Sequence, residues 1–258
     1  MQSLERNGVR LAFDTAGSGA PPILFVHGWC CDHSHFAPQV EHFKRRHRVV
    51  AVDLRGHGES DKPQDPYTMA SYADDLAWLS DRLGLQRVVV VGHSMGGVVA
   101  AALAADKPGL VAAVVLVDAP TLLTAEAIEA RGPFREALHG PDYARAATDF
   151  VRAMFLPTDD PDRGARITAG MLAVPQHVMA SSQDEIARFD MGGAVSRIKQ
   201  PLLYIGASAP RGDANALKKL APQLMAGQVV GAGHFCQLEA PEQVNAMIER
   251  FLVLTAPA

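Results

Sequence analysis

Short runs of consecutive apolar residues, many of them β-branched, recur along the chain between stretches whose apolar residues follow helical spacing. Such runs predict strands that are buried on both faces of a parallel sheet. They occupy residues 23–26, 49–52, 88–91, 114–117 and 201–205. Because predicted strands and helices alternate, the pattern indicates an α/β fold with a mostly parallel central sheet covered by helices on both faces.

Weaker patterns complete this outline. Residues 9–14 alternate between apolar and polar and predict an edge strand, and residues 228–230 predict the last strand. Asp213 is predicted to be the N-cap of the helix at residues 213–220, because its side chain can accept from backbone N–H groups in the first turn. Helices are predicted over residues 33–46, 68–83, 97–104, 213–220 and 241–254.

The pattern changes after residue 120. No strand is predicted between residues 121 and 196, where prolines and glycines separate helical pieces. These pieces cover residues 124–138, 141–155, 160–171 and 174–189. We therefore expect a core domain made of residues 1–120 and 197–258, and a helical cap (lid) domain made of residues 121–196. The cap is expected over the carboxyl ends of the strands, where open α/β sheets bind ligands.

Composition narrows the functional classes. The chain has 258 residues, of which 48% are apolar, and a net charge of −4, which argues against a nucleic-acid partner. We expect no membrane span and no signal peptide, because no apolar stretch is long enough and residues 1–6 lack an apolar region. Three cysteines, two of them adjacent, do not suit a disulfide framework, so a cytoplasmic location is expected. No metal and no cofactor is expected, and the oligomeric state is left open.

The sequence Gly92-His93-Ser94-Met95-Gly96 stands between a predicted strand and a predicted helix rich in small residues. Strand, G-x-S-x-G and helix together are typical of a nucleophile elbow. The sharp reversal strains the central residue and leaves no room for side chains two positions before and after it. Ser94 Oγ is then expected at the carboxyl end of the sheet, with the Met95 N–H pointing toward any oxyanion formed there. The alternative is a glycine-rich turn with an uninvolved serine.

With this elbow, the chain resembles the α/β-hydrolase fold family over nearly its whole length. The other motifs that carry the resemblance are His27-Gly28-Trp29, the glycine-containing loop 53–60 and Gly233-His234-Phe235. The resemblance implies a nucleophile, an acid and a histidine in that order along the chain. It implies Ser94 as nucleophile and His234 as the general base that takes the serine proton. The backbone N–H of Trp29 is implied as the second oxyanion donor, and Gly28 as the residue that allows the backbone to approach the substrate.

The acid departs from the usual pattern of the family. The loop at residues 206–210 has no carboxylate, although the family usually places its acid after the corresponding strand. Asp118 ends the strand after the elbow, and some branches of the family take their acid from that strand end. We therefore expect Asp118 to orient His234, with Asp213 as the alternative acid and a purely structural Asp118 as a further possibility.

The resemblance implies a serine hydrolase that cleaves small-molecule carboxylic esters or lactones through an acyl-enzyme on Ser94. Acyl-homoserine lactones are one candidate, and Gly28, Trp29, Met154 and Phe155 are expected in the substrate pocket. The loop at residues 28–33 also resembles that of cofactor-free dioxygenases of quinolone breakdown, although Met95 stands where those enzymes carry histidine. Three further functions stay open on this fold, namely carbon–carbon bond hydrolysis, perhydrolysis and ligand reception without turnover.

Overall fold

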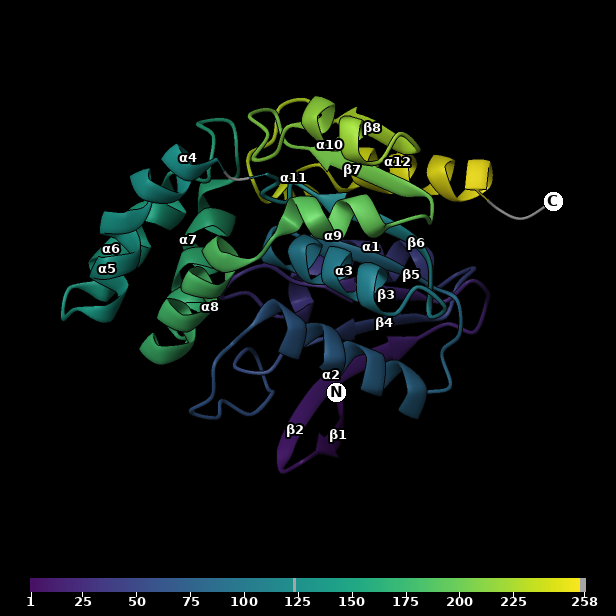
Figure 1. Ribbon diagram of the computed structural model, residues 1–258, viewed down its shortest axis with the longest axis horizontal. Coiled ribbons are helices and arrows are strands. Elements are labelled where there is room, and N and C mark those ends of the chain that lie inside the picture. Colours follow the sequence, from purple (N-terminus) through teal and green to yellow (C-terminus); the bar gives the residue numbers. More distant parts are fainter. Residues whose placement is uncertain (123, 256–258) are drawn as a thin grey trace.

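The α/β fold expected from the sequence is confirmed by the computed structural model, which describes residues 1–122 and 124–255. Within these residues, eight strands form one sheet in the order β1-β2-β4-β3-β5-β6-β7-β8 (Figure 1). β2 pairs antiparallel with β1 and β4, and all later pairs are parallel. The strands are β1 Gln2–Arg6, β2 Val9–Ala16, β3 Ile23–Val26, β4 Val49–Val52, β5 Val88–His93, β6 Val111–Val117, β7 Leu202–Gly206 and β8 Leu224–Gln228.

Helices cover both faces of this sheet. One face is covered by α2 (Met69–Arg82), α3 (Met95–Asp106), α9 (Met191–Arg197) and α10 (Ala214–Leu220). The other face is covered by the short 3-10 helix η1 (His33–Phe36) and by the helices α1 (Ala37–Phe43), α11 (Cys236–Glu239) and α12 (Pro241–Thr255). The remaining helices are α4 Ala125–Ala130, α5 Gly132–His139, α6 Tyr143–Arg152, α7 Pro161–Leu172 and α8 Gln176–Arg188.

The central strands are apolar at every position because both of their faces are buried. Along β5, Val90 belongs to the core beneath α2 and α3, whereas Val89 and Val91 belong to the core beneath α12. Successive side chains of a strand point to opposite faces, so a strand between two helical layers needs apolar residues throughout. This is why the sequence predicts these strands most accurately.

Two predictions at the sheet edges are wrong. The strand predicted at residues 9–14 is internal, because the unpredicted β1 pairs beside it and forms the edge. β1 is mostly exposed and therefore has no apolar pattern. The last strand is β8, Leu224–Gln228, which ends where the predicted strand begins. Val230, which belongs to the predicted strand, is 77% exposed. The register of β8 is determined by its pairing with β7, in which Leu224 is the partner of Leu202, and not by a run of apolar side chains.

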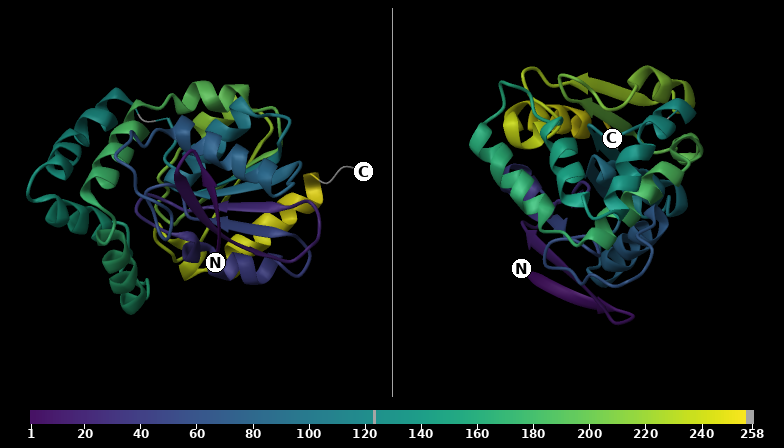
Figure 2. Two further views of the ribbon diagram at one scale, coloured as in Figure 1. Left: turned by 90° about the horizontal axis from the view of Figure 1, so that it is seen from below. Right: turned by 90° about the vertical axis from the view of Figure 1, so that its left-hand side faces the viewer.

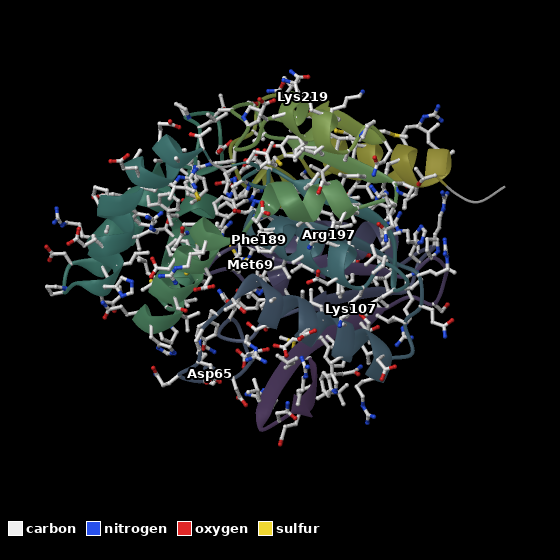
Figure 3. The ribbon with its side chains drawn as sticks, viewed as in Figure 1. Asp65, Met69, Lys107, Phe189, Arg197 and Lys219 are labelled. Carbon is white, nitrogen blue, oxygen red and sulfur yellow. The ribbon has the colours of Figure 1, made fainter. Side chains whose placement is uncertain are left out.

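The helices α4 to α8 lie together at one end of the sheet (Figures 1 and 2). α9 starts within the predicted cap range but packs against α3 on the face of the sheet. Arg197 of α9, labelled in Figure 3, donates to Asp106 of α3 at 3.3 Å. Residue 123 and residues 256–258, which the two predicted domains include, lie outside the described residues. No helix within the described ranges combines the length and apolarity needed to cross a membrane.

Candidate active site

Ser94 occupies the sharp turn between β5 and α3. Its backbone has φ of 52° and ψ of −120°, a strained conformation for a residue with a side chain. A Cβ atom on Gly92 would collide with the carbonyl group of Gly96, and one on Gly96 would collide with the carbonyl of Val26. Glycine is therefore required on both sides of the serine. The Ser94 N–H donates to Val117 O at 2.9 Å, which ties the turn to β6.

His234 lies in the loop between β8 and α11 and contacts Asp118, which follows β6. The distance from His234 Nδ1 to Asp118 Oδ2 is 2.6 Å, and both residues are buried. The other carboxylate oxygen, Oδ1, accepts from the backbone N–H groups of Ala207 at 3.1 Å and Arg211 at 3.0 Å. Because an ionised carboxylate only accepts, His234 Nδ1 carries the proton and Nε2 keeps its lone pair.

Asp213 has a different role. Its carboxylate accepts from the N–H groups of Asn215 at 2.8 Å and Ala216 at 3.0 Å, which makes it the predicted N-cap of α10. The carboxylate that contacts His234 is thus that of Asp118, which lies at the end of the strand that follows the elbow. Asp118 also has a positive φ of 42°, a conformation that aspartate and asparagine tolerate better than most residues.

The charge state of His234 follows from its burial. Loss of solvation lowers the pKa of His234 below its ordinary value, although the Asp118 carboxylate acts in the opposite direction. The positive charges of Arg211 and Arg131 lower this pKa further. The imidazole is therefore neutral at pH 7, which is the form that can accept a proton.

Ser94 and His234 line the same pocket, together with His93. The rings of His93 and His234 are 4.6 Å apart, and His93 Nε2 donates to the backbone oxygen of His234 at 2.9 Å. Within the described residues, Ser94 Oγ makes no hydrogen bond to His234 Nε2. Catalytic hydrogen bonds are often long in sites without substrate and shorten once substrate binds.

Two backbone N–H groups beside Ser94, those of Trp29 and Met95, have no acceptor among the described residues. The Gly28 carbonyl accepts from Cys31 N at 3.2 Å and from His27 Nδ1 at 2.8 Å. His27 Nδ1 is the donor in this pair because His27 Nε2 accepts from Leu54 N. Because the peptide between Gly28 and Trp29 is planar and trans, the Trp29 N–H points in the direction opposite to the Gly28 carbonyl. A Cβ atom on Gly28 would lie 3.2 Å from Ser94 Cβ, so this backbone passes directly against the serine.

The pocket is narrow in this conformation, with a cavity volume of about 30 Å³. Three of the four residues predicted for it, Gly28, Trp29 and Met154, line it. Phe155 does not line this pocket. This side chain faces a separate groove beside Gly164 and stacks on Phe235, with ring centroids 5.2 Å apart, because the chain turns after α6.

Two arginines that line the pocket are not predicted from the sequence. Arg131 comes from the junction between α4 and α5, and Arg211 from the loop between β7 and α10. Neither belongs to a motif, and each is surrounded in the sequence by ordinary loop residues. A single sequence carries no signal that these two positions meet.

The loop that carries His234 is held by the segment after α6. The backbone N–H of His234 donates to Met154 O at 2.9 Å, and that of Gly233 donates to Asp159 Oδ1 at 3.0 Å. Asp159 is buried, and its other oxygen accepts from Leu156 N at 2.8 Å. One carboxylate therefore joins the inserted helices to the histidine loop.

Replacing Asp159 with alanine should reduce the free energy of unfolding by roughly 1–3 kcal/mol, because the buried N–H of Gly233 and the half-buried N–H of Leu156 lose their acceptor. Asp159→Asn keeps one acceptor oxygen and should fall between the wild type and the alanine variant. Urea denaturation measures the change, with the exposed Asp142→Ala as control. Equal stability of Asp159→Ala and the wild type would contradict this role.

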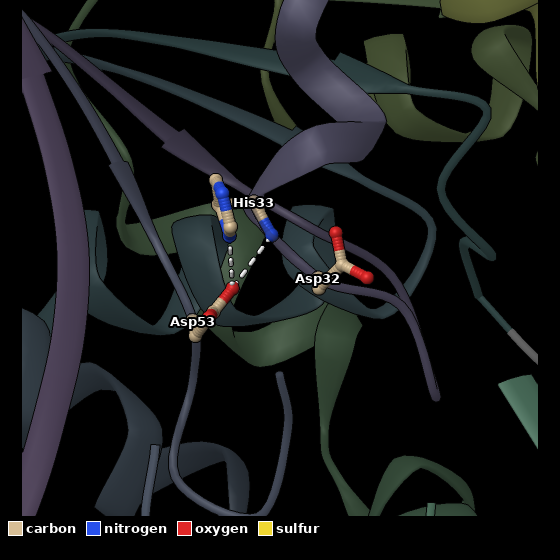
Figure 4. Close-up of side chains that lie close together, drawn as sticks. All are labelled: Asp32, His33 and Asp53. Carbon is tan, nitrogen blue, oxygen red and sulfur yellow. Dashed lines mark hydrogen bonds and ion pairs between the residues drawn. The ribbon is translucent and has the colours of Figure 1, made fainter. Parts of the chain in front are cut away.

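Asp32, His33 and Asp53 bring together three potential metal-ligand atoms within 4.8 Å of one another (Figure 4). The Asp53 oxygens already accept from His33 N at 2.7 Å, His33 Nδ1 at 2.8 Å and Glu59 N at 2.8 Å. Asp32 Oδ1 accepts from Ser34 N at 2.8 Å as the cap of η1. Because these carboxylates satisfy loop N–H groups, their grouping has a structural explanation.

Comparison with known proteins gives matches among hydrolases. The family described as "alpha/beta hydrolase fold" matches residues 21–241. The 2-(acetamidomethylene)succinate hydrolase of Mesorhizobium japonicum is 32% identical over 254 residues, covering 92% of this chain and 89% of that protein. The structure of the enol-lactonase from Burkholderia xenovorans LB400 is similar with a TM-score of 0.88 and 25% identity, covering 98% of this chain and 100% of the other. A thermophilic esterase from Thermogutta terrifontis has a TM-score of 0.87 and 27% identity, covering 100% of both chains.

Proposed function

We propose, from the premise that this chain belongs to the alpha/beta hydrolase fold family and is a hydrolase, that it cleaves carboxylic esters or lactones through an acyl-enzyme on Ser94. The observation that carries this proposal is the hydrogen bond of 2.6 Å between buried Asp118 and His234, a histidine that lines the same pocket as a strained serine. A carboxylate that orients a neutral imidazole is the arrangement that activates a serine hydroxyl.

In this mechanism, His234 Nε2 takes the proton of Ser94 Oγ as that oxygen attacks the substrate carbonyl. The N–H groups of Trp29 and Met95 donate to the resulting oxyanion, and removing one such donor typically costs ~3 kcal/mol of transition-state stabilisation. The imidazolium then gives its proton to the leaving oxygen, and the acyl group stays on Ser94. Water that loses its proton to His234 attacks this ester, the imidazolium returns a proton to the departing Ser94 Oγ, and the acid is released. Asp118 holds the tautomer and stabilises the imidazolium.

The helices α4 to α8 act in this proposal as a cap that limits which substrates enter. Support comes from the pocket wall, to which α6 contributes Phe150, α7 contributes Met171 and α8 contributes Ile186. Phe150 also packs edge-on against Trp29, with ring centroids 5.8 Å apart, so the cap is joined to the proposed oxyanion loop.

A panel of 4-nitrophenyl esters of increasing acyl length, an acyl-homoserine lactone and 2-(acetamidomethylene)succinate tests this function. We expect multiple turnover of esters or lactones, with an optimum at short acyl chains because the pocket is small. The last compound is included because the relative from Mesorhizobium is named for its hydrolysis. Oxygen uptake with a hydroxyquinolone would instead support a dioxygenase. Tight binding with a single turnover would support a ligand receptor.

The pH dependence of kcat/KM should show an acidic limb with a midpoint below 6.5, the ordinary histidine value, because burial lowers the pKa of His234. Activity is lost as pH falls through that pKa, since the imidazolium cannot accept the serine proton. The Asp118 carboxylate raises this pKa, so the residual activity of Asp118→Asn should have its midpoint at still lower pH. A midpoint above 6.5 in the wild type would contradict the assignment.

A further inference from the structure

Two arginine side chains reach the pocket that contains Ser94 and His234. Arg131 enters from the inserted helices, where it ends α4, and Arg211 enters from the loop that follows β7. The mechanism described above uses neither guanidinium group. Residues far apart in the sequence therefore bring two positive charges to the site of reaction.

The two guanidinium groups differ from other partly buried arginines of this protein. Arg55 pairs with Asp75, and Arg163 pairs with Glu239, in each case with a carboxylate that is itself buried. Within the described residues, the guanidinium groups of Arg131 and Arg211 make no ion pair and no hydrogen bond to a protein acceptor. No aspartate or glutamate among those residues lines the pocket.

Asp118 does not supply the missing partner. Its Oδ2 accepts from His234, and its Oδ1 accepts from two backbone N–H groups, one of which belongs to Arg211 itself. The side chain of Arg211 instead lies over the ring of Phe150, with its guanidinium carbon 5.8 Å from the ring centroid. This contact orients the group while leaving its N–H donors free.

Burial of these unpaired charges is unfavourable. Loss of solvation lowers the pKa of Arg131, and the nearby charges of Arg211 and Arg135 lower it further. Burial also lowers the pKa of Arg211. A ligand anion between the two guanidinium groups would supply the missing acceptors, and arginine can hold a carboxylate through two parallel hydrogen bonds.

We propose that Arg131 and Arg211 bind a carboxylate of the substrate, so that the preferred substrate is an anionic ester or lactone. This inference rests on the proposed function, because it assigns the class of molecule whose ester or lactone bond Ser94 attacks. The carboxylate is separate from the bond that is cleaved, and it can lie on the acyl part or on the leaving group. The pair sets specificity and orientation, whereas the chemistry stays with Ser94, His234 and Asp118.

The test compares matched neutral and anionic esters. 4-Nitrophenyl hydrogen glutarate is paired with 4-nitrophenyl valerate for the acyl side, and 3-acetoxybenzoate with phenyl acetate for the leaving-group side. In at least one pair, the wild type should prefer the anion. Arg131→Met and Arg211→Met should each lower the anionic-to-neutral ratio of kcat/KM by about ten- to a hundredfold, as expected for loss of a charge-assisted hydrogen-bond pair.

Methionine suits both positions because it fills similar space, and at position 211 it can still contact Phe150. The backbone N–H at position 211, which donates to Asp118, is retained. Arg145→Met is the matched control, because that arginine is exposed on α6 and pairs with Asp142. It should leave the ratio unchanged. The inference is overturned if the double variant keeps the wild-type ratio, or if the wild type prefers the neutral ester in both pairs.

A binding experiment separates this inference from the proposed function. Calorimetry with glutarate, which contains no bond to cleave, should show binding to the wild type that weakens at least tenfold in the double variant and falls with added salt. Failure of glutarate to bind the wild type, or equal binding to both proteins, overturns the anion site. Absence of any ester turnover by the wild type, with glutarate binding intact, overturns the proposed function and leaves the anion site supported.

Discussion

Replacing Ser94 with alanine is expected to abolish hydrolysis, with kcat/KM falling by at least about 10⁴-fold for every ester that the wild type cleaves. No other hydroxyl takes its place, because Ser94 is the only serine, threonine or tyrosine among the described residues that line the pocket. The variant should keep the fold. The Ser94 side chain makes no hydrogen bond within the described residues, and alanine neither adds nor removes a Cβ atom at this strained φ.

Steady-state turnover and thermal unfolding should be measured on the same preparations. Ser196→Ala is a suitable control, because this exposed serine on α9 donates only to Gly193 O. It should retain full activity. The nucleophile assignment fails if Ser94→Ala retains substantial turnover. Mass spectrometry of wild type quenched during turnover should show an added acyl group, and the same experiment on Ser94→Ala should not.

Replacing Asp118 with asparagine is expected to lower kcat by about 10³- to 10⁴-fold, with a smaller change in KM. The asparagine amide can donate to His234 Nδ1, which favours the tautomer that carries its proton on Nε2. That tautomer cannot accept the serine proton. Asparagine also tolerates the positive φ at this position, so the loss reports on the imidazole and not on an unfolded strand end.

Asp213→Asn is the matched comparison, because Asp213 is the alternative acid in the sequence and caps α10 in the structure. Asparagine is an equally good N-cap, so both activity and stability should remain close to the wild type. If Asp213→Asn lowers kcat by orders of magnitude and Asp118→Asn does not, the acid is wrongly assigned. If neither variant loses activity, His234 does not need a carboxylate partner and the proposed mechanism is incorrect.

In the proposed mechanism, an acid from the end of β6 takes the place of one from the loop after β7. These strands are parallel neighbours, so their carboxyl ends meet at the same edge of the sheet. The Asp118 N–H donates to Ile205 O at 2.7 Å, and its Oδ1 accepts from the N–H of Ala207. The loop after β7 therefore supplies backbone donors to the carboxylate, where the more usual arrangement would supply the carboxylate itself.

Features that depend on local pattern could be predicted from the amino-acid sequence. Strands β3 and β4 are predicted with their observed bounds, because both faces of the sheet are buried and every position must be apolar. The elbow at Ser94 is equally local, since its glycines are required by contacts within a few residues or with the adjacent strand. The N-cap role of Asp213 follows from its own helix, whose first N–H groups need an acceptor.

Features that depend on contacts between distant segments required the three-dimensional structure. β1 and β8 are held by backbone pairing at the edges of the sheet, which leaves little trace in apolar pattern. The choice between Asp118 and Asp213 required the position of His234, a residue more than a hundred positions from Asp118. The meeting of Arg131 and Arg211 depends on how the inserted helices pack over the sheet. Such contacts are set by packing across the whole molecule, so no periodicity or local motif encodes them.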